Sequence, residues 1–533
     1  LLRKYGPIPI MPDEGMDFTQ EYEDLAVARS SYDEVANFIA SEMQIAAKDL
    51  PLERGPLAIA RPTRGAALAA RAKVLLYAAS PINNPHPSDT EKFSDMVNFD
   101  GKHLIAQEYD ETKWARAAAA ALDVMELPGN QVNGRRYDLY HLGRRTSGSV
   151  GYPVTIEPYK DGDFSEHTWP DGWQDIDPFE SYRSLFDGEV SASDNYELIF
   201  TRGQNQSSEG VDIMVVHQLP TSATGWNTHG LTQKMCDAYY MNDGSDCPGK
   251  DLEIGGANGT VRETGFVDET NQENYPELGE HRIGVSLQYV QREPRFYASV
   301  AYNGSTWFLL NESNDANRNQ QVFYYRGMGN GYNNNNAFWL RTGIGVKKFV
   351  HPYDTHENRD MGRIRRKAEP AIRYAEILLI YAEALNELDG SHNIESWDGS
   401  KTYTIKRDIN EMKKGIRPIR CRAGIPDYTA AEYASKDLFR EKIKRERMIE
   451  LMGEGHRYYD LRRWKDAEKE ESQPIYGCNT LMTEQYKDLF HIPVVVPSLP
   501  TNFSRKMYFW PISHSELKRN RLLTQNPGWT YND

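Results

Sequence analysis

Several features that would assign this 533-residue chain to a common class of protein are scarce or absent. Cysteine occurs at only four positions, and no two cysteines form a Cys-x-x-Cys pair. Four scattered thiols are too few for a disulfide framework and lack the spacing of zinc or thiol-redox sites. One bridge between Cys236 and Cys247 stays possible if the protein is exported.

Long apolar runs are also missing. No stretch of about 18 apolar residues, the length of a membrane-spanning helix, occurs in the chain. The first residues lack the basic, apolar and small-residue zones of a signal peptide. Leu1–Pro7 instead carries two cations followed by glycine and proline, which is how a helix ends. We therefore expect the natural protein to extend beyond Leu1.

Positive charge is in deficit. The chain has 62 Lys and Arg against 77 Asp and Glu, a net charge of −15, so its field repels phosphate backbones and anionic headgroups. Residues 440–465 look basic, but glutamates interleave with the cations there at helical spacing. We interpret Glu450 and Arg457 as internal pairing residues. The sequence therefore predicts no nucleic-acid partner.

Motifs of catalysis are absent as well. The chain has no HExxH, GxSxG, P-loop or GxGxxG motif, and its histidines do not cluster. Gly327–Gly331 is glycine-rich but lies among asparagines and is interpreted as a turn. Asn242–Asp246 offers hard oxygen atoms to calcium without the full EF-hand pattern. We predict no catalytic residues, no metal, no cofactor and no enzymatic activity.

What the chain does have is helical periodicity at both ends of a long irregular middle. Amphipathic or alanine-rich helices are predicted over Ser31–Leu50, Thr63–Ser80, from Glu111, from Pro370 to Gly390, over Lys436–Met452 and through Trp464. In the first, Ser31 with Glu34 three residues on is a plausible capping box, and the apolar stripe is Val35, Phe38, Ile39 and Ile45. The stripe of the second is Leu68, Ala72, Leu75 and Ala79. Between residues 130 and 365 short β-like runs, such as Tyr196–Thr201 and Phe296–Ala301, alternate with turn clusters.

This pattern predicts a mainly α fold. Helix pairs with small residues at their contacts are typical of tetratricopeptide-like repeats, although no clean 34-residue period is present. We expect a single unit with repeat helices at 1–129 and 366–470. Residues 130–365 would form a loop-rich ligand-binding region with short strands, and residues 471–533 an irregular C-terminal region.

Aromatic residues are abundant, at 11% of the chain. Tyrosine and tryptophan join a flat apolar face to a polar group, which suits a wet binding surface. Sugar rings lie their C–H faces on such rings while polar side chains bind the hydroxyl groups. The candidate ligand-binding residues in the loop-rich region are Trp169, Trp173, Trp226, Tyr289, Trp307, Tyr332, Phe338, Trp339 and Arg341.

Among these rings, at least one of Trp226, Trp307 and Trp339 is predicted to stack on a bound sugar. Their polar neighbours able to hold hydroxyl groups are Asn227, Asn303, Ser305 and Arg341. Three further tryptophans, Trp114, Trp464 and Trp510, fall on helical or apolar stripes and are assigned to the core.

Several segments, in order along the chain, resemble the SusD/RagB family. The early ones are Leu1–Ile10, RPTRGAALAARAKVLLYAAS at Arg61–Ser80, LTQKMCDAYYMN at Leu231–Asn242 and REPRFYASVAYNG at Arg292–Gly304. The strongest are AIRYAEILLIYAEALNE at Ala371–Glu387, RERMIELMGEGHRYYDLRRW at Arg445–Trp464 and FWPISHSELKRNRLLTQNPGW at Phe509–Trp529. The family's lipidated cysteine and first helices have no counterpart here.

The resemblance implies a function that composition alone does not. It implies a lipid-anchored protein on the extracellular face of the outer membrane that captures an oligosaccharide or polysaccharide. Its partner would be a SusC-like TonB-dependent β-barrel transporter, which it would cover as a lid. The lipid anchor would belong to the missing N-terminal segment. A peptide-capturing member of the same family and a generic helical-repeat adaptor stay open as alternatives.

Overall fold

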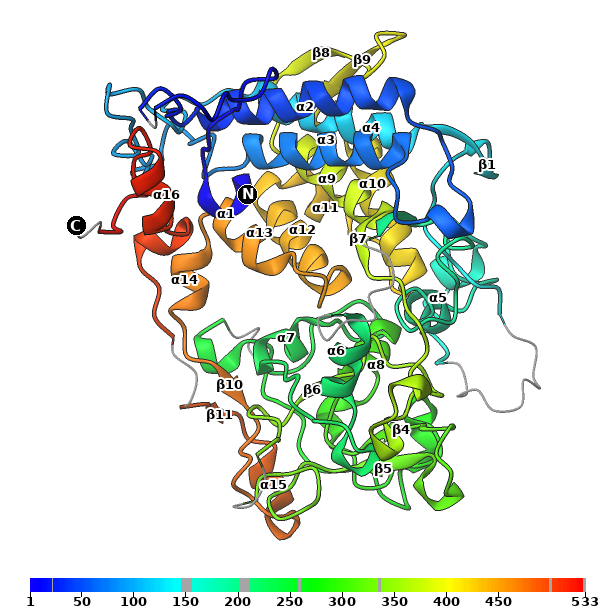
Figure 1. Cartoon of the computed structure of the whole chain (residues 1–533). Coiled ribbons are helices and arrows are strands. Elements are labelled where there is room, and N and C mark those ends of the chain that lie inside the picture. Colours follow the sequence, from blue (N-terminus) through cyan, green and yellow to red (C-terminus); the bar gives the residue numbers. More distant parts are fainter. Residues whose placement is uncertain are drawn as a thin grey trace.

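The computed structural model of the protein describes residues 1–21, 23–144, 156–201, 210–256, 260–333, 337–497 and 501–530. A layer of helices lies along one side of the molecule, and a loop-rich layer with short helices and strands lies along the other (Figure 1). The fold is mainly α with small scattered strands and is consistent with tetratricopeptide-like repeats, which confirms the predicted fold class.

Six longer helices form the helical layer, and each packs on its neighbours in order. Helix α2 contacts α3, α3 contacts α4, α4 contacts α9, and α9 contacts both α10 and α12. Their bounds are Tyr32–Asp49 for α2, Arg64–Ala79 for α3, Thr112–Met125 for α4, Tyr374–Asn386 for α9, Ile409–Arg422 for α10 and Lys436–Glu450 for α12.

The remaining helices are short. They are α1 (Leu2–Tyr5), α5 (Pro178–Arg183), α6 (Val211–Gln218), α7 (Gln233–Ala238), α8 (Pro294–Ser299), α11 (Ala430–Ala434), α13 (Arg457–Arg463), α14 (Ala467–Glu471), α15 (Lys487–Phe490) and α16 (His514–Arg519).

The described strands pair two by two and antiparallel, apart from β1 (Pro128–Val132). The pairs are β2 (Leu198–Thr201) with β7 (Pro370–Arg373), β3 (Val300–Ala301) with β6 (Gly345–Val346), β4 (Ser305–Trp307) with β5 (Gln320–Val322), β8 (Ser391–Glu395) with β9 (Thr402–Lys406), and β10 (Tyr476–Gly477) with β11 (Val494–Val495).

Small residues allow the helices of this layer to approach closely. The predicted stripe of α3, Leu68, Ala72, Leu75 and Ala79, is buried, as are the alanines of α4 that face it. Between α9 and α10 the approach is closer still, because a Cβ on Gly415 would lie 2.5 Å from the carbonyl oxygen of Leu378. The alanine-rich pattern therefore predicted helix contacts correctly.

Helix starts were predicted with mixed success. The Ser31 hydroxyl accepts from the amide of Glu34, whose carboxylate accepts from the amide of Ser31, which is the predicted capping box of α2. Along α2, however, Phe38 and Ile45 are exposed, and Val35 is buried together with alanines. The predicted apolar stripe of α2 is thus wrong in part, because alanines make the contact with α3.

Two predicted boundaries fail where a strand forms. Pro370 was expected at the first turn of a helix, but Pro370–Arg373 is strand β7, paired with β2, and α9 begins at Tyr374. The segment predicted as a strand from Phe296 forms helix α8 up to Ser299, because Pro294 occupies a helix start. Helix α10 and the β8–β9 hairpin were not predicted.

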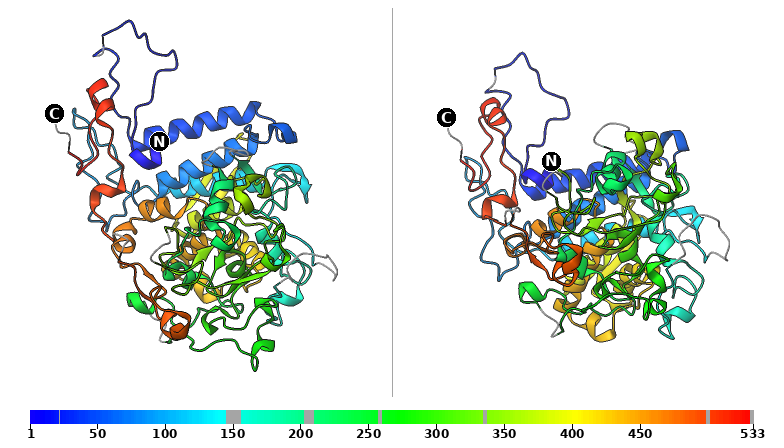
Figure 2. Two further views of the ribbon diagram at one scale, coloured as in Figure 1. Left: turned by 60° about the horizontal axis from the view of Figure 1, so that its bottom comes forward. Right: turned by 90° about the horizontal axis from the view of Figure 1, so that it is seen from below.

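The two ends of the described chain lie side by side at one end of the molecule (Figures 1 and 2). The Trp510 amide donates to the carbonyl of Lys4, and Asn526 Nδ2 donates to the carbonyl of Tyr5. Trp510 is 41% exposed and covers the Lys4 ammonium, so its assignment to the core is wrong. Trp114 and Trp464 are buried as predicted.

Neither the cysteines nor the calcium candidate form a site in the described part of the chain. All four cysteines are buried and none is in a disulfide, so Cys236 and Cys247 form no bridge. Asp243 accepts from Ser245 and Asp246 pairs with Arg445, and no cluster of three or more possible metal ligands occurs among the described residues. None of the described helices combines the length and apolarity needed to span a bilayer.

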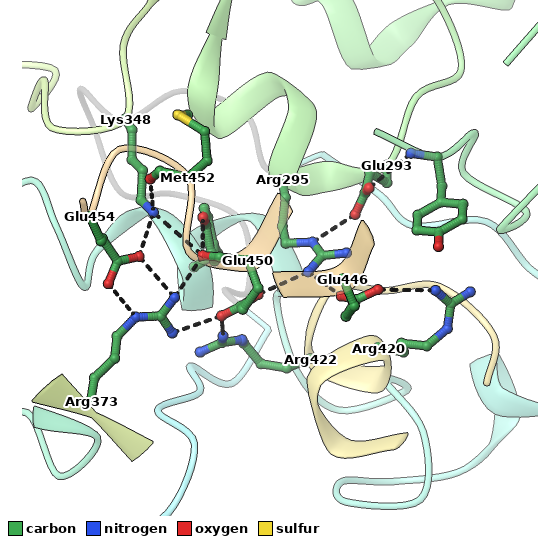
Figure 3. A network of polar contacts seen from close by, with 12 residues as sticks. Glu293, Arg295, Lys348, Arg373, Arg420, Arg422, Glu446, Glu450, Met452 and Glu454 are labelled. Atoms are coloured by element: carbon green, nitrogen blue, oxygen red, sulfur yellow. Dashed lines mark hydrogen bonds and ion pairs between the residues drawn. The ribbon is translucent and has the colours of Figure 1, made fainter. Parts of the chain in front are cut away.

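A buried charge network joins the two layers (Figure 3). Glu450, at the end of α12, forms ion pairs with three arginines. Its carboxylate lies 2.9 Å from the guanidinium of Arg295 of α8 and 2.8 Å from that of Arg373 of β7, and it also pairs with Arg422 of α10. All four side chains are at most 3% exposed. The prediction that Glu450 is an internal pairing residue is therefore confirmed, whereas Arg457 is only half-buried and pairs with Glu470.

The network continues from Glu450 to the carboxylate of Glu454. Arg373 Nε lies 2.8 Å from Glu454, and Lys348 Nζ lies 2.8 Å from the same carboxylate and 2.7 Å from the Met452 carbonyl. Burial raises the pKa of Glu454, but Arg373 and Lys348 outweigh it and lower the pKa to about 2. Since Arg295 and Lys348 belong to the loop-rich layer, these ion pairs fix that layer against the helices.

Replacing the shared carboxylate should destabilise the fold. Glu450→Gln leaves buried guanidinium groups without their partner, and we expect a loss of about 3 to 5 kcal/mol in the free energy of unfolding. Urea unfolding followed by circular dichroism measures this loss. Glu441→Gln, on the exposed face of the same helix, is the matched control and should change little. Equal effects of the two variants would contradict the assignment.

The same network predicts the direction of acid sensitivity. The arginines hold the pKa of Glu450 below its ordinary value of 4.5 despite burial. A carboxyl whose pKa is lower in the folded state contributes stability above its unfolded pKa and loses it as pH falls toward the folded value. We expect the urea concentration at the unfolding midpoint to decrease as the pH is lowered below about 4.5. The decrease should be smaller in Glu450→Gln than in the parent protein. Identical pH profiles would contradict this expectation.

Candidate ligand-binding site

The structure divides the predicted binding residues into core and surface. Trp173, Tyr289 and Trp307 are 0%, 1% and 3% exposed, so the expectation that these rings lie open on loops is wrong. Trp173 stacks on Phe164, while Tyr289 stacks on Phe296. The loops around them are polar in sequence but fold over their own aromatic residues.

The polar neighbours of Trp307 are withdrawn from solvent with it. Asn303 and Ser305 are both 0% exposed, and Asn303 Oδ1 accepts from the amide of Tyr324. Neither side chain is available to a sugar hydroxyl in this conformation. Trp169 is half-buried and faces His141, with ring centroids 5.0 Å apart.

The other predicted residues come together from two loops. Trp226 stacks on Phe338 with centroids 5.7 Å apart and planes within 10°, and Phe338 is 46% exposed. Tyr332 and Trp339 meet at 4.8 Å, and the exposed Arg341 places its guanidinium 4.3 Å from the Trp339 ring centroid. The prediction thus found residues that are distant in sequence and adjacent in space.

Hydrogen bonds between asparagine side chains and backbone groups hold the two loops to each other. Asn227 Nδ2 donates to the carbonyl of Asn330 at 2.8 Å, and the amide of Thr221 donates to Asn330 Oδ1 at 2.8 Å. Asn227 is therefore buried and engaged, in contrast to its predicted role toward a ligand. The glycine-rich segment forms a turn as predicted, and a Cβ on Gly331 would lie 1.9 Å from the carbonyl oxygen of Tyr325.

Two histidines that were not predicted extend this group of rings. His217, in the last turn of α6, meets Trp226 edge-on at 4.4 Å and stacks on His229 at 5.1 Å. Burial lowers the pKa of both histidines. We call His229, His217, Trp226 and Phe338 the ring row.

The ring row begins at the edge of a cavity of about 950 Å³. The cavity lies between α6 and α7 on one side and α12, α13 and α14 on the other, the region between the two layers in Figure 1. His229 and Thr228 line it, and the Thr228 hydroxyl lies 2.6 Å from His217 Nδ1. Its apolar lining includes Met214, Met235, Phe349, Met448, Leu451, Met452 and Ile475.

The charged groups of this cavity are paired within the protein. Lys234 pairs with Glu470, and Arg457 Nη2 lies 3.2 Å from the same carboxylate. Glu253 pairs with Arg262, which also pairs with Asp237. A cavity with apolar walls, paired charges and a row of rings at its edge suits a neutral ligand that has flat apolar faces and hydroxyl groups.

Comparison with known proteins identifies the relatives of the chain. Residues 180–529 match the sequence profile of the SusD family. Over 163 residues the chain is 31% identical to SusD-like protein P2 of Formosa agariphila, a match that spans 30% of this chain and a quarter (25%) of that protein's length.

Solved structures share the fold along nearly the whole chain. BT4246 has a TM-score of 0.71 and 23% identity, with 99% of this chain and 81% of that chain covered. A SusD-like protein from Bacteroides fragilis has a TM-score of 0.61 and 22% identity, covering 99% and 76%. A SusD-like carbohydrate binding protein from the same species has a TM-score of 0.57 and 19% identity, covering 98% and 76%.

The division of the rings predicts different consequences of alanine substitution. Trp307→Ala should lower the free energy of unfolding by about 3 to 5 kcal/mol, because it opens a cavity in the core. Trp339→Ala removes a ring at the surface and should cost about 1 kcal/mol or less. Urea unfolding of both variants measures the difference. A loss for Trp339→Ala as large as that for Trp307→Ala would place Trp339 in the core.

Proposed function

The chain belongs to the SusD family, and from this premise we propose that it captures an oligosaccharide or polysaccharide without cleaving it. The observation that carries the proposal is the ring row at the edge of the large cavity, with Tyr332, Trp339 and Arg341 close by in sequence. Rings of this kind bind the C–H faces of sugars, while histidine, threonine and arginine groups bind hydroxyls.

Two further observations support a sugar ligand. The histidines of the ring row have lowered pKa values, so they act at neutral pH as uncharged donors and acceptors, which suits a neutral polyol. A structural relative from Bacteroides fragilis is described as a carbohydrate binding protein. Capture then depends on shape and on stacking.

Family membership also supports a place and a partner for this activity. We propose that the protein lies on the extracellular face of the outer membrane, held by an N-terminal lipid anchor. A SusC-like β-barrel transporter would receive the glycan, with this protein as its lid. The lid would act by differential binding and domain motion.

The proposed site predicts a specific pattern of binding losses. A glycan array first identifies the ligand, and calorimetry then measures its affinity for each variant. Trp226→Ala and Trp339→Ala should each weaken binding by about ten- to a hundredfold, since a stacked ring contributes about 1 to 3 kcal/mol.

Trp397→Ala is the matched control, because Trp397 is also half-buried but lies in the turn between β8 and β9, beside Arg64. It should bind like the parent. If both Trp226→Ala and Trp339→Ala bind the identified glycan as tightly as the parent, the site lies elsewhere.

The proposal also predicts that the protein hydrolyses nothing. Incubation with the bound glycan should produce no new reducing ends over the background of a boiled sample. Turnover that persists through successive purification steps and falls in a site variant would contradict a capture role.

A further inference from the structure

Lys347 lies directly after strand β6 and beside a lysine with very different surroundings. Lys348 donates to the Met452 carbonyl at 2.7 Å and to Glu454 at 2.8 Å, inside the buried network. No hydrogen bond or ion pair to the side-chain nitrogen of Lys347 occurs in the described part of the chain. Its Nζ lies 5.8 Å from the centroid of the Tyr302 ring.

The Lys347 side chain lines a pocket of about 200 Å³. A cavity needs about 10 to 15 Å³ of such volume to hold one water molecule, so the pocket has space for a small ligand. Aromatic walls come from Tyr297, Tyr302 and Phe308, and polar groups from Thr306 and Asn319. We call this cavity the lysine pocket.

The lysine pocket is separate from the ring row. Val346, the residue before Lys347, lines the large cavity, and its amide donates to the carbonyl of His229. The Lys347 amide donates in the other direction, to the carbonyl of Ser299. Because successive residues of an extended chain point to opposite faces, the two cavities lie on opposite sides of β6.

A half-buried ammonium without a counter-charge is unfavourable for folding. Burial lowers the pKa of Lys347 to about 8, and no carboxylate among the described residues lies close enough to offset it. Glu277 and Glu280 also line the pocket, but Glu277 accepts from the amide of Gln291 and Glu280 is exposed, and neither pairs with Lys347. Lys347 is half-buried, and a partly desolvated ammonium that receives no acceptor from the protein can pair with an anionic group of a ligand.

We propose that the lysine pocket is a second ligand site that binds a sugar carrying an anionic group, a carboxylate or a sulfate ester. The anion would pair with Lys347, and the sugar ring would lie against Tyr302 and Phe308. The sugar part of this inference rests on the proposed function, while the anionic part rests on Lys347 alone. The protein would thereby distinguish acidic from neutral glycans.

Nuclear magnetic resonance of the lysine side chains tests this site directly. Reductive methylation with ¹³C-formaldehyde labels the amines, and Lys347→Arg assigns the Lys347 signal by its loss. Glucuronate and glucose 6-sulfate are titrated separately, with glucose as the neutral control. We expect the Lys347 signal to shift and its pKa to rise with at least one of the two anionic sugars and not with glucose. A shift with neither anion, or an equal shift with glucose, overturns the proposal.

Substitution distinguishes a binding role from a structural one. Lys347→Met should weaken binding of the anionic sugar at least about tenfold while leaving the melting temperature unchanged or higher, because it removes an uncompensated charge. Lys347→Arg should retain binding, and Lys406→Met on the exposed side of β9 should change neither property. A lower melting temperature for Lys347→Met with unchanged binding would assign Lys347 to the structure and overturn the proposal.

The two proposals fail in different ways. Lys347→Met should leave the affinity of a neutral glycan for the ring row unchanged, whereas Trp226→Ala should lower it. If neither tryptophan variant binds the neutral glycan more weakly than the parent, the ring row is refuted as a site. The shifts at Lys347 are then judged on their own. Absence of those shifts refutes the lysine pocket and leaves the ring row untouched.

Discussion

The carboxylate of Glu450 is the point on which the two layers of this fold depend. It forms ion pairs with Arg295 of the loop-rich layer and with Arg373 and Arg422 of the helical layer, and all of these side chains are buried. Removing several charges from water is costly, and the ion pairs offset that cost only if the geometry is complete. The network therefore specifies one relative position of the layers, which a merely apolar contact between irregular loops would leave less defined.

Strand β6 connects this charge network to the candidate ligand-binding site. Lys348 joins the network, and the two residues before Lys347, Gly345 and Val346, pair with β3. The Val346 amide donates a hydrogen bond to the carbonyl of His229, the first residue of the ring row. The rings thus belong to loops, but strand β6, which is joined to the buried ion pairs, positions the backbone of those loops.

Features that depend on residues close together in the sequence were predicted, whereas features that depend on contacts between distant residues were missed. The stripe of α3 and the cap at Ser31 are local patterns, so both were found. Strand β7 depends on pairing between Pro370 and Thr201, far apart in the chain, so a helix was predicted in its place. The burial of Trp173 and Trp307 depends on how their own loops fold over them, which composition and spacing do not predict. His217 was not found, because only the fold brings it to Trp226.

The neighbouring residues Val346, Lys347 and Lys348 show how one short segment can serve stability and binding together. Val346 faces the large cavity, Lys347 the lysine pocket, and Lys348 the buried network. Lys348 and Lys347 are both cations for which burial is unfavourable, but the protein supplies acceptors only to the first. A chain shaped by stability alone would place an apolar side chain at position 347, since that change removes a charge and breaks no ion pair. The position of Lys347 in the wall of the lysine pocket therefore supports the proposed pairing with an anionic ligand.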